Sequence, residues 1–324
     1  MAHKPILKKL VNVNSYLEHR QHIIRRIQKA LDHQLVVYTA SPYHPVSSIM
    51  KHDIPPLEDL LRTVDPTKKG ILMINSQGGN GDTAEKILCM CRKRFSESFK
   101  VIVPDYAKSA ATMIALGADE ILMGYLSELG PIDPQFSSGI GGPMTPARSF
   151  IDGLDMIRKN VKENEDPIEL YYPMINKLKP ETIAQAESAI EGAREFAEKW
   201  LKLTQLSHNL RHATQVAKWL SDGKKYKSHG KVLNFEECKS ILKLNVTEIE
   251  KESSLWNDIW ELYCRHIMHL QGNSQAAKIF ENAKVSNTIM INVGKIVPVQ
   301  PSQDVPERPP EESKSKKCWT FISE

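Results

Sequence analysis

The strongest constraint on the fold is a strand–helix–strand pattern in the first half of the chain. The run 70–75, Gly-Ile-Leu-Met-Ile-Asn, is almost wholly apolar, which is typical of a parallel strand covered on both faces. A helical segment follows to about residue 95, and further apolar runs occupy 101–104 and 120–124. Repeats of this kind predict an α/β fold with a mostly parallel sheet and right-handed crossovers.

The flanking regions differ from this pattern in composition and periodicity. Apolar residues recur at helical spacing near the N-terminus, whereas the C-terminal end is polar and rich in proline, a composition typical of disorder. We therefore expect an N-terminal helical segment over 1–34, a main domain over 35–250, a C-terminal helix and strand extension over 251–300, and a disordered tail over 301–324.

Charge and hydropathy bear on location and partners. The formal net charge of +4 is small for 324 residues, and the basic stretch near the start is better explained as a solvated helix face than as a nucleic-acid site. No apolar run approaches the ~20 residues that cross a bilayer. Five cysteines without a CxxC pair are typical of free thiols in a reducing compartment. We therefore expect a cytoplasmic protein that binds no nucleic acid.

Metal and nucleotide motifs are weak in this sequence. His208 and His212 are spaced as a helical pair, but no third ligand is evident, so a surface pair is favoured. The glycine loop at 76–81 is not followed by the GK[ST] of a P-loop, and it does not fit a GxGxxG fingerprint. We expect no metal and no cofactor.

Two segments with chemical potential follow neighbouring strands of the predicted sheet. Gly78 and Gly79 come after the strand at 70–75, and Ser109 begins a helix after the next strand. The carboxyl ends of parallel strands meet at one edge of a sheet, where α/β proteins place their ligand sites. A glycine amide and the amide of Ala110, at the positive end of a helix, would form a two-donor oxyanion hole. The pattern therefore indicates a site for acyl chemistry.

The same residues carry a family resemblance. Residues 74–79, Ile-Asn-Ser-Gln-Gly-Gly, resemble the glycine loop of the Clp protease proteolytic subunit, and residues 107–113 resemble its nucleophile turn. The signal peptide peptidase A branch of that superfamily is closer still, and within it the SDH_sah group of serine dehydrogenase proteinases. The closer resemblance covers about 35–250 and is carried by 103–110, 118–124, 127–135 and the Lys-Ser-His-Gly of 227–230.

The resemblance implies a ClpP/crotonase-like fold of stacked β-β-α units with a helical C-terminal extension, usually in a homo-oligomer. It also implies a serine peptidase-like hydrolase that cleaves peptide bonds, with Ser109 as nucleophile and Gly78 or Gly79 together with Ala110 as oxyanion donors. The expected substrate is a peptide or protein, and a segment derived from a membrane protein is one option.

The general base is the open point. Where Clp-type peptidases carry a histidine, residues 132–135 read Ile-Asp-Pro-Gln, which makes Asp133 a candidate to bind substrate or orient a base. The signal peptide peptidase branch uses a lysine instead, and Lys159 and Lys162 lie at the corresponding distance from Ser109. A lysine serves as base only if burial lowers its pKa from about 10.4. Both lysines lie in a charged stretch, so a solvated helix face is the alternative for each.

Two other functions compete with the hydrolase. A ClpP-fold scaffold or peptide-binding module would keep the cleft and lack a general base. A crotonase-type acyl-CoA enzyme would use the same paired amides without a serine nucleophile, and the peptidase-like form of 127–135 argues against it.

Overall fold

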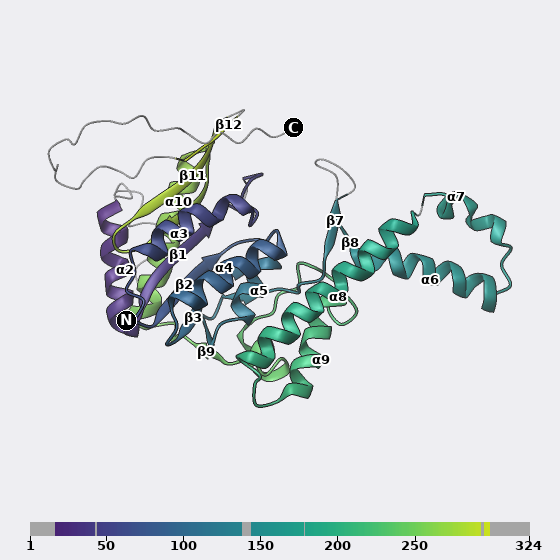
Figure 1. Cartoon of the computed structure of the whole chain (residues 1–324), viewed down its shortest axis with the longest axis horizontal. Helices are drawn as coiled ribbons and strands as arrows, with labels where there is room; N and C mark the ends of the chain where they lie inside the picture. The colour runs from purple at the N-terminus through teal and green to yellow at the C-terminus, as the bar shows by residue number, and fades with distance from the viewer. Residues whose placement is uncertain (1–16, 43, 138–143, 178, 293–294, 299–324) are drawn as a thin grey trace.

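One eight-stranded sheet organises the chain in the computed structural model, which describes residues 17–42, 44–137, 144–177, 179–292 and 295–298 (Figure 1). The strand order is β12-β11-β10-β1-β2-β3-β5-β9. Five neighbouring strands are parallel, namely β1 (Gln34–Ala40), β2 (Gly70–Asn75), β3 (Phe99–Val103), β5 (Glu120–Met123) and β9 (Val246–Glu248). The predicted α/β class with a mostly parallel sheet is confirmed.

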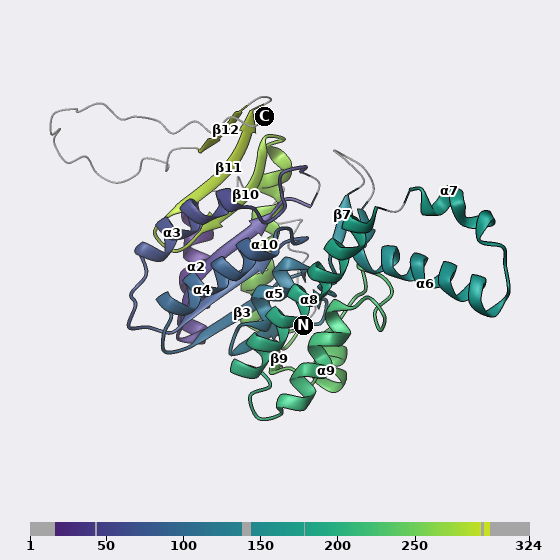
Figure 2. The same cartoon turned by 45° about the vertical axis from the view of Figure 1, so that its right-hand side comes forward.

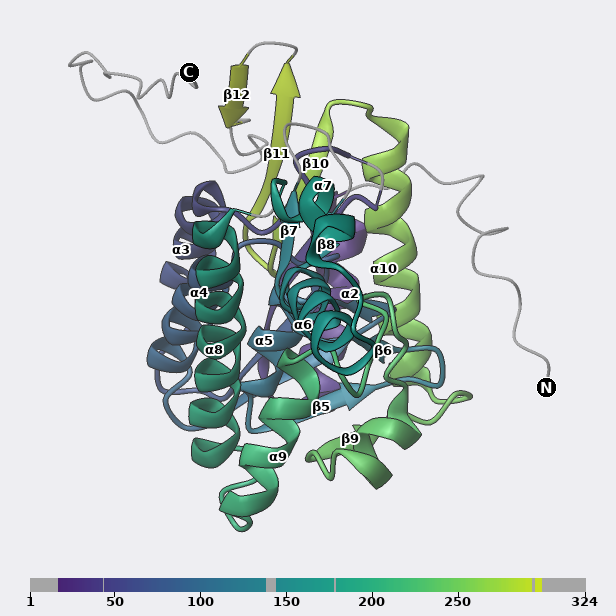
Figure 3. The same ribbon diagram turned by 90° about the vertical axis from the view of Figure 1, so that its right-hand side faces the viewer.

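The apolar runs became strands because both faces of the sheet are covered. Every residue of β2 is buried. On one face lie α2 (Leu17–Leu31) and α10 (Ser254–Gly272). The other face is covered by α3 (Ile54–Arg62), α4 (Gly81–Arg94), α5 (Ala110–Leu116) and the end of α8 (Pro180–Leu203). Figure 3 shows these two groups of helices on opposite sides of the sheet.

A helical arm projects from this body. It comprises α6 (Ala147–Glu163), η2 (Ile168–Tyr171), α7 (Tyr172–Ile175) and the first part of α8 (Figures 1 and 2). None of the residues in η2 and α7 is buried. The chain returns to the body through Phe196, Trp200 and Leu201 of α8, which join the main hydrophobic core.

Shorter elements complete the chain. They are η1 (Lys51–Asp53), β4 (Tyr106–Ala107), β6 (Glu128–Leu129), β7 (Gln135–Ser137), β8 (Met144–Pro146), α9 (Leu210–Ser221) and η3 (Glu237–Ile241). The strand β4 pairs in parallel with β6, and β7 pairs antiparallel with β8. No helix within the described ranges has an apolar stretch of sufficient length to span a bilayer.

The C-terminal region contributes more strand than the sequence indicates. Strands β10 (Ala276–Glu281), β11 (Ser286–Asn292) and β12 (Lys295–Pro298) extend the main sheet antiparallel from β1. Lys278 and Glu281 interrupt the apolar pattern of β10, yet both are fully buried in ion pairs, with Asp53 and Arg20 respectively. The division into four parts stays a prediction, and 1–16 and 301–324 lie outside the described residues.

Two glycines give opposite predictions for stability. A Cβ at Gly70 would lie 2.0 Å from the ring of Phe95, which is 1% exposed, so Gly70→Ala should lower the free energy of unfolding by about 1–3 kcal/mol. Gly192, exposed in α8, has nothing within 4 Å of its Cβ position, so Gly192→Ala should raise that free energy by about 0.5–1 kcal/mol. Urea titrations measure both, and shifts of equal sign would contradict the packing described.

Candidate active site

The glycine loop links β2 to α4 and requires glycine at two positions. Gly78 has φ 99° and Gly79 has φ 149°, backbone conformations that side chains rarely adopt. Asn80 closes the loop as the N-cap of α4, because its side chain accepts a hydrogen bond from the Thr83 N–H at 2.8 Å.

This loop lies directly against the turn that carries Ser109. A Cβ at Gly78 would be 2.6 Å from the carbonyl oxygen of Lys108, 2.7 Å from the Ser109 Cβ and 2.9 Å from the Ala110 nitrogen. Backbone hydrogen bonds join the two segments: the Ser76 N–H donates to Tyr106 (3.2 Å) and the Lys108 N–H donates to Ser76 (3.0 Å). The structure therefore brings Gly78, Ser109 and Ala110 together.

Ser109 occupies a strained turn between β4 and α5. Its φ of 50° and ψ of −119° lie in a region that costs a non-glycine residue roughly 1–3 kcal/mol. The residue is only partly buried, although its neighbours Lys108 and Ala110 are buried. A sharp strand-to-helix turn that exposes a hydroxyl is the way α/β-hydrolases present a nucleophile.

The backbone amides around Ser109 differ in their partners. The Gly78 N–H donates to the Ser76 hydroxyl at 3.1 Å. Ile49 pairs with Gly79 in a parallel bridge. The Ile49 N–H donates to the Gly78 carbonyl and the Asn80 N–H donates to the Ile49 carbonyl, both at 2.8 Å, so the Gly79 N–H points away from Ile49. Within the described residues neither the Gly79 N–H nor the Ala110 N–H has a partner. The Gly79 and Ala110 amides are therefore available to donate to a ligand.

Asp133 is held in a polar contact that the sequence did not reveal. Its carboxylate is buried, and Oδ1 lies 2.8 Å from Nδ1 of His229, while Oδ2 accepts from the side-chain amide of Gln135 at 2.7 Å. The two segments are joined by an antiparallel bridge between Leu129 and Leu233, with hydrogen bonds of 2.9 and 3.1 Å. The His229 side chain is 29% exposed, so the imidazole is partly accessible to a ligand.

Lys108 connects this pair to the serine turn. Its ammonium donates to the carbonyl oxygens of Leu129 (3.0 Å) and Lys231 (3.2 Å) and forms an ion pair with Glu128 at 2.9 Å. The residue immediately before Ser109 thus contacts both segments, and both pass beside the serine turn.

The two candidate lysines lie elsewhere on this chain. Lys159 and Lys162 are exposed on α6 in the projecting arm (Figure 2). The Lys159 side chain is 66% exposed and lies 3.8 Å from Glu163. Among the described residues no hydrogen bond or ion pair joins either lysine to Ser109, the glycine loop or Asp133. The burial that a lysine base needs is absent in this conformation.

The sequence reasoning missed His229 because it searched for a histidine at the Clp-type distance from Ser109. His229 is separated from Asp133 by 96 residues, and only the tertiary fold joins them. The available signal was its place in the Lys-Ser-His-Gly of 227–230, a segment already similar to the family.

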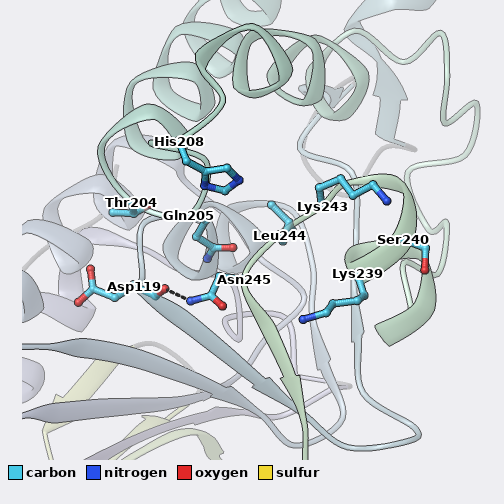
Figure 4. Close-up of a pocket in the computed structure, with 9 residues that line it drawn as sticks. All are labelled: Asp119, Thr204, Gln205, His208, Lys239, Ser240, Lys243, Leu244 and Asn245. Carbon is cyan, nitrogen blue, oxygen red and sulfur yellow. Dashed lines mark hydrogen bonds between the residues drawn. The ribbon is translucent and has the colours of Figure 1, made fainter.

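A separate pocket of about 730 Å³ lies at the amino ends of the parallel strands, where β5 begins (Figure 4). It contains none of the predicted site residues. Its lining residues are Asp119, Thr204, Gln205, His208, Lys239, Ser240, Lys243, Leu244 and Asn245. In the part of the chain that the structure describes, no group of three or more His, Cys, Asp or Glu side chains is arranged to hold a metal ion.

Two curated relatives are uncharacterized proteins of Methanocaldococcus jannaschii. One is 27% identical over 169 residues, which are 51% of this chain and 50% of that protein. The other is 37% identical over 101 residues, which are 30% of this chain and 33% of that protein. The chain thus spans about half the length of one relative and a third of the other.

Solved structures with a related arrangement share little sequence. A variant of the 1510-N membrane-bound stomatin-specific protease has a TM-score of 0.41 and 15% identity, over 69% of this chain and 84% of that one. ClpP1 from Listeria monocytogenes has a TM-score of 0.37 and 15% identity, over 70% and 98% of the two chains. Likenesses of this size carry no argument about function.

A family model covers most of the chain. The model described as ClpP-like SDH-type serine proteinase matches residues 6–275, a range that contains the glycine loop, Ser109, Asp133 and His229. This match confirms the resemblance found in the sequence motifs. The chain belongs to the family of ClpP-like SDH-type serine proteinases.

Proposed function

We propose that this chain is a serine peptidase in which Ser109 is the nucleophile, His229 the general base and Asp133 the residue that orients the base. The observation that carries the proposal is the 2.8 Å contact between Asp133 Oδ1 and His229 Nδ1 in segments that border the Ser109 turn. A histidine held by a buried carboxylate supplies the base that the sequence motifs lacked.

The chemistry follows from this arrangement. Asp133 accepts the Nδ1–H of His229, which leaves Nε2 unprotonated and able to take the proton of Ser109 as its oxygen attacks the substrate carbonyl. The oxyanion that forms accepts hydrogen bonds from the N–H groups of Gly79 and Ala110. The imidazolium then protonates the leaving amine. In the second step His229 takes a proton from the attacking water and returns it to the Ser109 oxygen as the acyl-enzyme is hydrolysed.

Among the described residues Ser109 and His229 share no hydrogen bond. Catalytic hydrogen bonds are often long before substrate binds and tighten in the substrate complex. The partial exposure of His229 and Ser109 is consistent with closure of this kind.

Lys159 and Lys162 remain the alternative base. Either would have to approach Ser109 from an exposed helix and lose its solvation, so their present exposure favours His229. The scaffold alternative loses its main support, the missing base, once His229 is counted.

The substrate class is inferred from the family, and the oligomeric state and location are inferred from the sequence. The family consists of serine proteinases, so we propose a peptide or protein substrate. A membrane-protein-derived substrate, a homo-oligomeric assembly and a cytoplasmic location stay predictions from the sequence.

Labelling with a fluorophosphonate tests the nucleophile and the base together. The wild-type chain should gain one adduct on Ser109, detected by mass spectrometry, and Ser109→Ala should gain none. His229→Gln should slow labelling about 10²–10⁴-fold, the usual contribution of a general base.

Lys159→Ala and Lys162→Ala are the matched controls and should react at the wild-type rate. Loss of labelling in either lysine variant, with His229→Gln unaffected, would assign the base to lysine. A folded wild-type chain that takes up no probe would support the scaffold.

Alanine substitutions at Gly78 and Gly81 distinguish a specific effect on the oxyanion hole from a general disturbance of the segment 76–81. Gly78→Ala would drive a Cβ into Ser109 and Ala110, so peptidase activity should fall by about 10² or more. Gly81→Ala would meet only the flexible end of Met113, at 3.4 Å, and should keep near-normal activity. Equal losses in the two variants, measured as kcat/KM on a fluorogenic peptide, would refute this geometry.

A further inference from the structure

A fully buried ion pair lies behind the glycine loop. Lys278 of β10 and Asp53 of η1 are both 0% exposed, and Lys278 Nζ lies 2.6 Å from Asp53 Oδ1. The ammonium also donates to the Ser48 carbonyl at 2.6 Å and lies 3.2 Å from Nε2 of His52. Its three hydrogens therefore have three acceptors, as a buried ammonium requires.

The pair reaches the loop first through the backbone. Lys278 binds the Ser48 carbonyl, and Asp53 Oδ2 accepts the Met50 N–H at 3.0 Å, so the ion pair holds both neighbours of Ile49. Ile49 in turn uses its own N–H and carbonyl to bind the Gly78 carbonyl and the Asn80 N–H, each at 2.8 Å. The peptide units on both sides of Gly79 are thus fixed by the segment that the ion pair holds.

The second route runs through side chains. The Tyr38 hydroxyl donates to Asp53 Oδ2 at 3.1 Å. Burial and Asp53 raise the pKa of Tyr38, and the neighbouring Ser76 hydroxyl opposes that shift, so Ser76 faces the Tyr38 hydroxyl. Ser76 Oγ accepts the Gly78 N–H at 3.1 Å. The Ser76 hydroxyl thus lies between the Gly78 amide and the Tyr38 hydroxyl, and Asp53 is the charged acceptor beyond them. The Gly78 N–H is therefore occupied by Ser76, and the Gly79 N–H is available to bind the substrate oxyanion.

The structure assigns Lys278 and Asp53 as positioning residues that set the orientation of the Gly79 N–H in the oxyanion hole. This assignment rests on the proposed peptidase function. Lys278 lies beyond residue 275, where the match to the family model ends.

The charges themselves support this role. Burial lowers the pKa of Lys278, and the neighbouring Asp53 carboxylate opposes that shift. Burial and the Lys278 ammonium lower the pKa of His52, so its imidazole is neutral and Nε2 acts as an acceptor. Without Lys278, Asp53 would be a lone buried carboxylate, which is strongly disfavoured, and both routes to the loop would lose their common acceptor.

Tyr38→Phe and Lys278→Met test the assignment against a matched control. Glu281→Gln weakens another buried ion pair of the same strand, on the opposite face. Within the described residues the Glu281 carboxylate contacts Arg20 (2.8 Å), His266 (3.1 Å) and Ser286, none of which belongs to the glycine loop or the segment 48–53. The measurements are the affinity for a peptide boronate, which forms a tetrahedral adduct with a serine, and kcat and KM on a fluorogenic peptide. All are made at a temperature where every variant is folded.

Tyr38→Phe and Lys278→Met should lose about tenfold or more in boronate affinity and kcat, part of the 10²–10³ that removal of an oxyanion donor costs, with KM nearly unchanged. Glu281→Gln should lower Tm and leave boronate affinity and kcat intact. A merely structural pair would lower Tm in all variants without this split. Should Lys278→Met fail to fold, Tyr38→Phe, which removes one hydroxyl and no charge, decides the question.

Failure of this inference is distinguishable from failure of the proposed function. If wild type binds the boronate and both Tyr38→Phe and Lys278→Met bind it equally well, the positioning role is overturned and Ser109 catalysis stands. If wild type does not bind it, the peptidase proposal fails, and amide hydrogen exchange over 76–80 decides the positioning role. Faster exchange than in Glu281→Gln supports that role, and equal exchange overturns it.

Discussion

The site depends on the contact between Gly78 and the Ser109 turn, where two backbones meet with no side chain between them. A Cβ at Gly78 would overlap Ser109 and Ala110, so the absence of a side chain at Gly78 allows the loop after β2 to contact the turn between β4 and α5. Hydrogen bonds from Ser76 to Tyr106 and from Lys108 to Ser76 keep the two segments in register. Because β2 and β3 are parallel neighbours, the segments that follow them meet at the carboxyl ends of the strands. The other residues of the site are arranged around this meeting point.

Buried charges support this contact from two sides. Lys108 ties the serine turn to the segments that carry Asp133 and His229, and the Lys278–Asp53 pair supports the glycine loop from behind. Each ammonium has three partners: two backbone carbonyls and Glu128 for Lys108, and one backbone carbonyl, His52 and Asp53 for Lys278. A buried charge is tolerated under this condition. These two ion pairs thus hold irregular backbone beside the site.

The sequence predicted the local parts of this structure well. The apolar runs at 70–75, 101–104 and 120–124 match β2, β3 and β5 within two residues, because a strand buried on both faces is marked by composition alone. Strand β10 was missed because Lys278 and Glu281 interrupt its apolar pattern, and the partners that bury their charges lie more than two hundred residues away. His229 was missed because it lies far from the Clp-type distance after Ser109, and its contact with Asp133 exists only in the tertiary fold.

A crystal structure of the chain with a peptide boronate is the most direct test of the central claim. The proposed mechanism predicts a bond from boron to Ser109 Oγ, with one boron oxygen about 2.7–3.1 Å from the backbone nitrogens of Gly79 and Ala110. It also predicts Nε2 of His229 within hydrogen-bond distance of the adduct, and Nδ1 still on Asp133. An adduct oxygen bound by the Gly78 N–H instead, or a lysine ammonium where His229 is expected, would contradict it.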